Sequence, residues 1–283
     1  MNVNISHSVI NEHAPIFFEL IELVTDCLRS KGVDVSYTKN QVDVRCVNLI
    51  VGHTMFLSRD IFTQIRSLSN DYIVFQLEAL DSEQGFSATH PAYFDFLRGA
   101  KQVWDYSPQN TQYLDGMGIA NVRHIPLGYS ARLAKIVDAR EHDIDVLFFG
   151  IVTPRRLWVM NELRRAGFAT ALLTGVYGST RDSQIGRAKI ALNIHQFDTS
   201  QLEHVRITYL LNNKRFVISE TSENHPYGDG VVFCDYKDIV ARCAYYLGRG
   251  MKEKRARIAK SGHECLKRIP MAKSMINALK ELA

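Results

Sequence analysis

Four side chains in the middle of the chain have the chemistry to bind a phosphorylated or hydroxyl-rich ligand: His195, Glu203, Arg206 and Glu220. A carboxylate accepts hydrogen bonds from ribose or sugar hydroxyls, and a guanidinium donates to phosphate or sugar oxygens. We therefore expect these residues to line one ligand-binding crevice. Each also has a structural alternative: Glu203 and Arg206 are spaced as a surface ion pair, and His195 and Glu220 suit hydrogen-bonded core positions.

The elements around these residues predict why they would meet. Residues 187–194 and 215–219 are apolar runs of strand length, typical of strands buried on both faces. Between them, apolar side chains recur at helical spacing over residues 201–212. Two parallel strands joined by a helix form a right-handed βαβ unit, whose ligands bind at the carboxyl ends of the strands. The four polar side chains all lie close to those ends.

A second candidate group lies in the sequence FFGIVTPRRL. A buried strand, residues 145–149, is followed by a turn at Gly150 and by Pro154, which favours the first position of a helix. Arg155 and Arg156 then lie in the first helical turn. Free backbone N–H groups, the helix dipole and two forked guanidinium groups suit a diphosphate there. The alternative is a solvated helix face.

Two further segments complete the predicted ligand-binding set. Gly175 and Tyr177 lie in a glycine-flanked turn after a predicted strand, and this turn holds a base or a sugar unless its use is only structural. Lys189 and Asn193 lie on the central predicted strand and add a cation and an amide.

Composition restricts the class of protein. A chain of 283 residues is long enough for two α/β domains, and its formal net charge of +4 is small for a duplex-binding protein, so we expect no nucleic-acid partner. The five cysteines include no C-x-x-C pair, which predicts a reduced, cytoplasmic protein without a zinc site. The sequence lacks G-x-G-x-x-G and P-loop motifs, which argues against a dinucleotide dehydrogenase or a P-loop enzyme. We also expect no metal ion.

Alternating predicted strands and helices fill both halves of the chain. This pattern indicates an α/β protein with two doubly wound, Rossmann-like domains that face each other across a cleft. The first domain covers residues 1–128, a polar linker follows, and the second domain covers residues 143–267.

Three groups of segments resemble bacterial glycosyltransferases of the GT-B fold: VWDYSPQN…HIPLGY, DVLFFG…RR and AKIALNIH…LEHVRI…FVISE. The resemblance implies an acceptor-side first domain and a second domain that binds a nucleotide-diphosphate sugar as co-substrate, with no other cofactor. It also implies that the final helix, residues 268–283, packs back on the first domain. Many retaining members carry two glutamates eight positions apart, whereas Leu211 is eight positions after Glu203. The stereochemistry of transfer therefore stays open.

An inverting transfer needs a base that deprotonates the acceptor hydroxyl. Glu78 and His53 follow predicted strands of the first domain and are the candidates, each with a structural alternative. Glu78 is preferred because it precedes a long polar loop, residues 80–91. In a retaining transfer, Arg155, Arg156 and Lys189 would instead stabilise the leaving diphosphate.

The sequence leaves two questions open, the role of a basic stretch and the presence of catalytic activity. The basic stretch of residues 249–260 is a solvated helix face, or it makes weak contact with anionic lipid next to the inner membrane, which would suit a glycan or lipid-linked acceptor of the cell envelope. The chain is a glycosyltransferase, or it is a non-catalytic two-domain protein that binds a nucleotide or a sugar. Turnover of a nucleotide sugar would distinguish the glycosyltransferase from the non-catalytic binding protein.

Overall fold

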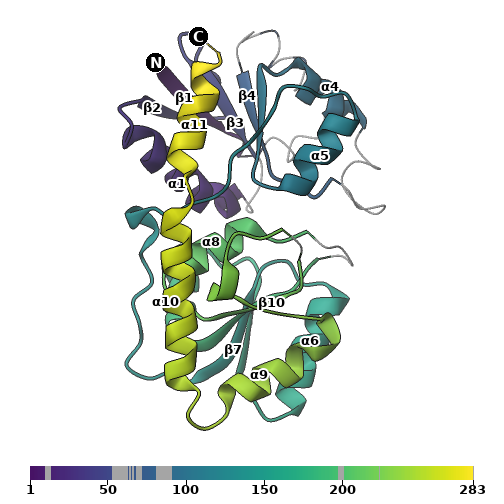
Figure 1. Cartoon of the computed structure of the whole chain (residues 1–283), viewed down its shortest axis with the longest axis vertical. Helices are drawn as coiled ribbons and strands as arrows, with labels where there is room; N and C mark the ends of the chain where they lie inside the picture. Colours follow the sequence, from purple (N-terminus) through teal and green to yellow (C-terminus); the bar gives the residue numbers. More distant parts are fainter. Residues whose placement is uncertain are drawn as a thin grey trace. The chain divides into compact units, whose positions relative to one another are not determined.

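The structure is a computed structural model that describes residues 1–9, 14–52, 63, 65, 67, 72–80, 91–196, 201–222 and 224–282 (Figure 1). It divides into two compact units. The first contains Met1–Leu127 and Pro270–Ala283, and the second contains Gly128–Ile269.

Within the described residues, the first unit has one parallel sheet in the order β2-β1-β3-β4-β5-β6. Its apolar strands are buried, as their composition predicts, but β2 is absent from the sequence prediction because one residue of its six is buried. The strands are β1 (Asn2–His7), β2 (Asp34–Lys39), β3 (Val47–Val51), β4 (Tyr72–Gln76), β5 (Gln102–Asp105) and β6 (Val122–His124).

Helix α5 (Pro108–Gly116) of this unit begins where its local signals predict. The Ser107 side chain caps α5 by accepting from the Asn110 N–H, and Pro108 is the first helical residue. Ile16 lies in the 3₁₀ turn that precedes α1 and is exposed. The helices are η1 (Ala14–Phe17), α1 (Phe18–Arg29), α4 (Pro91–Gly99), α5 (Pro108–Gly116) and α11 (Met271–Lys280).

Helix α11 belongs to the first unit although it comes last in the sequence. It contacts α1, as Figure 1 also shows. The buried Gln102 side chain of β5 donates to the Ala278 carbonyl at 2.8 Å and accepts from the Trp104 indole at 2.9 Å. These contacts attach the final helix to the sheet of the first unit.

Within the described residues, the second unit has one parallel sheet in the order β11-β10-β9-β7-β8. The strand order reverses between β7 and β9, because β8 lies on one side of β7 and all later strands lie on the other. Ligands of doubly wound sheets bind at such a switch point, outside the carboxyl ends of the strands. The strands are β7 (Ile144–Phe149), β8 (Thr170–Leu173), β9 (Ala188–Asn193), β10 (Val217–Glu220) and β11 (Val232–Cys234).

Helices cover this second sheet and bury its apolar side chains. Val146, Phe148, Ile190 and Ile218 of the sheet form one core with Val159 and other helical residues. The helices are η3 (Ala131–Leu133), α6 (Pro154–Arg165), α7 (Gly178–Arg187), α8 (His204–Asn212), η4 (Gly228–Gly230), η5 (Tyr236–Asp238), α9 (Ile239–Leu247) and α10 (Lys252–Arg268).

The polar segment expected to be a linker packs on the second unit. The backbone N–H groups of Ser130 and Ile136 donate to the Asn212 and Asn213 side chains at 3.0 and 2.8 Å. A Cβ atom on Gly186 would lie 2.2 Å from the Val137 carbonyl oxygen, so glycine allows this close approach. The segment is therefore part of the second unit rather than a free connection.

Candidate functional site

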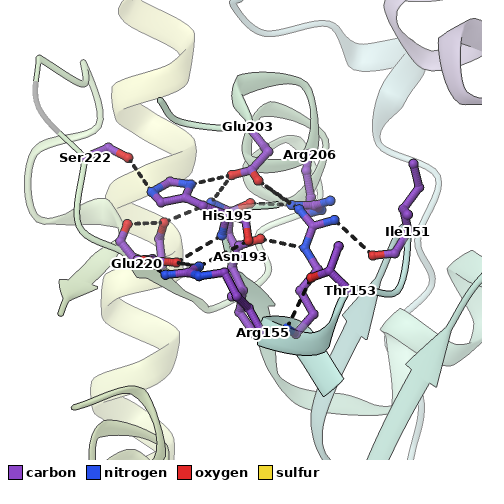
Figure 2. A network of polar contacts seen from close by, with 12 residues as sticks. Ile151, Thr153, Arg155, Asn193, His195, Glu203, Arg206, Glu220 and Ser222 are labelled. Atoms are coloured by element: carbon purple, nitrogen blue, oxygen red, sulfur yellow. Dashed lines mark hydrogen bonds and ion pairs between the residues drawn. The ribbon is translucent and has the colours of Figure 1, made fainter. Parts of the chain in front are cut away.

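A network of charged side chains lies at the carboxyl ends of β7, β9 and β10, next to the switch point of the second sheet. Figure 2 shows that its members come from the segment after β7, the end of β9, the start of α8 and the end of β10. The structure thus brings together the four residues predicted to share a crevice and adds the two arginines of α6. The charged and amide members are Arg155, Arg156, Asn193, His195, Glu203, Arg206 and Glu220.

Glu203 lies at the centre of the network. Its Oε1 atom accepts from Arg156 at 2.9 Å, and its Oε2 atom accepts from Asn193 and from His195 Nδ1, both at 2.9 Å. Burial acts to raise the pKa of Glu203, but the His195 hydrogen bond and the charges of Arg206, His195 and Arg156 lower it to about 2. Glu203 is therefore an ionised acceptor at neutral pH. Its side chain is 26% exposed, and Oε1 has capacity for a further donor such as a ligand hydroxyl.

Both ring nitrogens of the buried His195 face oxygen atoms. Nδ1 is 2.9 Å from Glu203, while Nε2 is 3.2 Å from the Thr221 carbonyl and 3.1 Å from the Ser222 hydroxyl. Burial acts to lower the pKa of His195, but the hydrogen bond and charge of Glu203, with the charge of Glu220, raise it. The geometry is that of an imidazolium that donates from both nitrogens.

Arg155 forms a forked ion pair with the buried Glu220. Its two terminal nitrogens donate to the two carboxylate oxygens at 2.9 and 2.7 Å, and its guanidinium carbon lies 4.1 Å from the centre of the Tyr236 ring. Glu220 also accepts from the His195 backbone N–H at 3.1 Å. The pair therefore joins the start of α6 to the ends of β9 and β10.

Arg156 is more deeply buried, with 2% of its surface exposed. It donates to the carbonyl oxygens of Ile194 and Ile151, each at 2.9 Å, and to Glu203. Burial lowers the pKa of Arg156 to about 10, which still leaves it charged at neutral pH. All three donors point into the protein, so the guanidinium supports the shape of the site and is not a solvated helix face.

Arg206 has unused hydrogen-bonding capacity. One terminal nitrogen donates to the Asn193 side chain at 2.5 Å, while Nε is buried and has no hydrogen-bond partner in the described structure. The guanidinium lies over the Phe148 ring, 5.1 Å from its centre, and 3.8 Å from the nearest Glu203 oxygen. Burial lowers the pKa of Arg206. A partly buried cation with an unpaired N–H is suited to an anionic ligand.

The other predicted ligand-binding residues are divided between the two ends of the second sheet. Gly150 follows β7 and lies against Arg206, while Gly175 and Tyr177 follow β8 at the same edge of the sheet. Lys189, by contrast, lies near the amino end of β9, where it donates to Asp145 at 2.7 Å. Because the strand begins at Ala188, Lys189 belongs to the opposite end of the sheet.

In the first unit, Glu78 follows β4 and its backbone is firmly held. The Gln76 amide accepts from the Glu78 N–H at 2.6 Å and donates to its carbonyl at 2.9 Å, and Asn110 donates to the same carbonyl at 2.8 Å. Both amides also donate to the buried Asp105. Burial raises the pKa of Asp105 to about 7 against these hydrogen bonds. His53, the other predicted base, lies outside the described residues.

The eight-residue spacing of the two-glutamate pattern is found on the amino-terminal side of Glu203. The residue eight positions before Glu203 is His195, and the two side chains are hydrogen-bonded. The two-glutamate spacing is thus present with a histidine at its first position. Asp105 was missed as well, although a carboxylate that ends the apolar strand VWD just before a helix cap was a readable signal.

The described residues contain no group of three or more His, Cys, Asp or Glu side chains placed to hold a metal ion. They also contain no helix with the length and apolarity to cross a membrane. In the basic stretch, Arg249, Lys252, Arg257 and Lys260 are exposed. All five cysteines are free thiols.

No protein-family model matches this chain. The uncharacterized protein R358 of Acanthamoeba polyphaga mimivirus is 32% identical over 154 residues, which cover 52% of this chain and 53% of that protein. A second uncharacterized protein of the same virus is 26% identical over 183 residues and 24% of its own length. The chain therefore spans about half the length of the first relative and less of the second. These relatives are viral, so the bacterial affiliation stays a prediction.

Solved structures match the whole chain. The Anabaena protein Alr3699/HepE, crystallised in complex with UDP and glucose, matches with a TM-score of 0.68 and 9% identity, and the match covers 100% of this chain and 99% of that one. AviGT4, a glycosyltransferase involved in avilamycin A biosynthesis, matches with a TM-score of 0.57 and 13% identity over 100% and 98%. A putative UDP-N-acetylglucosamine 2-epimerase from Listeria monocytogenes matches with a TM-score of 0.53 and 9% identity over 100% and 97%. At such identities the likeness establishes the fold alone. The predicted fold class is confirmed: the chain has the two Rossmann-like domains of the GT-B fold.

Proposed function

We propose that this protein is a glycosyltransferase that moves a sugar from a nucleotide-diphosphate sugar to a hydroxyl group of a glycan or lipid-linked acceptor. The charge of the network at the switch point carries the proposal. Arg155, Arg156, Arg206 and protonated His195 face the carboxylates of Glu203 and Glu220, which leaves positive charge in excess. The diphosphate of a nucleotide sugar is a dianion that would balance this excess.

Two side chains give the proposed ligand its orientation. The guanidinium of Arg206, whose side chain is 12% exposed, would donate to a phosphate oxygen, and Oε1 of Glu203 would accept from a ribose or sugar hydroxyl. In this arrangement Arg155 and Arg156 act mainly by holding Glu220 and Glu203 in place. During transfer, Arg206 would stabilise the charge that develops on the leaving diphosphate. Glu78 or His53 of the first unit would supply the base if the reaction inverts configuration.

The first test measures nucleotide binding and turnover. A thermal-shift panel of UDP, GDP, CDP, dTDP and CMP should show stabilisation by at least one nucleoside diphosphate, since a ligand at about 100 times its dissociation constant adds about 2.7 kcal/mol to the free energy of unfolding. Nucleotide sugars of the same base should then be hydrolysed slowly, with release of the sugar. If no member of the panel raises the melting temperature, the proposed function is wrong.

One observation favours the alternative of a non-catalytic binder. Arg155 and Arg156, the cations first expected to stabilise a leaving diphosphate, are already paired with protein acceptors. With these two cations paired to protein groups, fewer donors of the described network are left to stabilise a leaving diphosphate, which favours binding over catalysis. Nucleoside diphosphate binding without turnover of the matching nucleotide sugar, with or without added glycan acceptors, would select this alternative.

A further inference from the structure

His195 links two segments that are separated in the sequence: the residues just before α8 and the residues just after β10. Its Nδ1 atom contacts Glu203 just before α8, and its Nε2 atom contacts the Thr221 carbonyl just after β10. Its own backbone is fixed from two sides, because its N–H donates to Glu220 and its carbonyl accepts from Arg155 at 3.3 Å. The ring is 1% exposed, so a ligand has little direct access to it.

The two contacts require two ring protons. A neutral imidazole carries one N–H and one lone pair, so one nitrogen would present its lone pair to an acceptor oxygen at 2.9 or 3.2 Å. The Ser222 hydroxyl, 3.1 Å from Nε2, could donate to that lone pair, but the Thr221 contact would then be lost. Only the imidazolium satisfies both Glu203 and Thr221.

We propose that His195 is a positioning residue whose imidazolium fixes the Glu203 carboxylate for a ligand hydroxyl and links it to the segment after β10. The proposal rests on the proposed function for the identity of the ligand. The charged groups that face the ring or its backbone are Glu203 from the segment before α8, Glu220 from β10 and Arg155 from α6; Arg156 and Arg206 lie behind Glu203. The two carboxylates favour the protonated ring, consistent with the raised pKa of His195.

The protonation state is tested first without any ligand. Nitrogen NMR of the imidazole rings should show both His195 nitrogens protonated near pH 6.5 and a pKa above that of a free histidine. Because the folded-state pKa is raised, the stabilisation is complete below the unfolded pKa and is lost as pH rises through the folded pKa. As pH rises through the folded-state pKa of His195, the melting temperature of the wild type should therefore fall more than that of His195→Asn, which keeps one N–H donor but does not titrate.

The positioning role is tested with UDP by calorimetry. As pH rises from below to above the His195 pKa found by NMR, wild-type affinity for UDP should fall by roughly fivefold to tenfold, the size expected for a weakened charge-assisted hydrogen bond. The affinity of His195→Asn should stay level, while the control His263→Asn should follow the wild type, since His263 is a buried histidine that contacts the Leu211 carbonyl.

Each outcome bears on a different claim. A neutral His195 ring near pH 6.5, or a wild-type pH profile in His195→Asn, would overturn the positioning role. A protonated ring in a protein that binds none of the nucleoside diphosphates of the panel at any pH would instead overturn the proposed function, together with the hydroxyl contact inferred for Glu203.

Discussion

Arg206 differs from the other two arginines of the network in how its guanidinium is paired. Arg155 and Arg156 spend their donors on protein carboxylates and carbonyls, whereas Arg206 keeps a buried N–H without a partner in the described structure. The sequence does not reveal this difference. Two arginines at a helix start suit an anion in the same way whether or not protein carboxylates already pair with them. Only the distance of each guanidinium from Glu203 and Glu220 decides which cation has capacity left.

Gly150 makes room for Arg206, which gives a prediction at the residue scale. Gly150 has a φ of 140°, and a Cβ atom there would lie 2.8 Å from a terminal nitrogen of Arg206. Gly150→Ala should therefore strain the backbone by about 1–3 kcal/mol and displace the guanidinium. We expect UDP affinity to fall by about tenfold or more, measured by calorimetry.

The matched control is Gly116→Ala. Gly116 lies at the end of α5 in the first unit, and nothing lies within 4 Å of the position its Cβ would take. It should leave both UDP affinity and melting temperature nearly unchanged. Unaltered UDP binding in folded Gly150→Ala would show that Arg206 does not need its present position.

At the scale of elements, α10 supports the segment that follows β10. A Cβ atom on Gly230 of η4 would lie 2.2 Å from the Gly262 Cα atom of α10. The same segment is held to α8 by Tyr227, whose hydroxyl is 3.1 Å from His204 Nδ1. This packing fixes the chain that carries Thr221 and Ser222, the partners of His195 Nε2.

Gly230→Ala should break this packing because backbone, not a flexible side chain, lies in the way. We expect the free energy of unfolding to fall by about 1–3 kcal/mol, the usual cost of overpacking a tight contact. Urea unfolding followed by circular dichroism measures the change, with Gly116→Ala again as the control. Equal midpoints for the two variants would mean that η4 and α10 can separate at little cost.

The elements that the sequence predicts well are those with one dominant signal. The apolar runs at β4 and β7 are strands because both faces are buried, and Ser107 with Pro108 marks the start of α5. The mostly exposed strand β2 and the polar helix α7 carry no such signal. Lys189 lies at the amino end of β9, and the predicted strand bounds of residues 187–194 already implied this position.

At the scale of the whole molecule, two doubly wound sheets repeat one topology with different polar groups at their carboxyl edges. The second unit places three arginines, a histidine and two glutamates there, whereas the first unit holds Glu78 through Gln76, Asn110 and Asp105. The GT-B fold accounts for both sheets, and the charge of the second network is what favours a nucleotide diphosphate over a neutral ligand.

The central claim is that Arg206 binds the diphosphate at this switch point. Calorimetry of UDP and of uridine with the wild type, Arg206→Gln and the exposed control Arg249→Gln tests it most directly. Loss of a charge-assisted hydrogen bond, worth about 1.5–3 kcal/mol, should weaken UDP binding to Arg206→Gln by about 10- to 150-fold while uridine binding barely changes. Arg249→Gln should match the wild type. UDP affinity within about threefold of the wild type in folded Arg206→Gln would contradict the account.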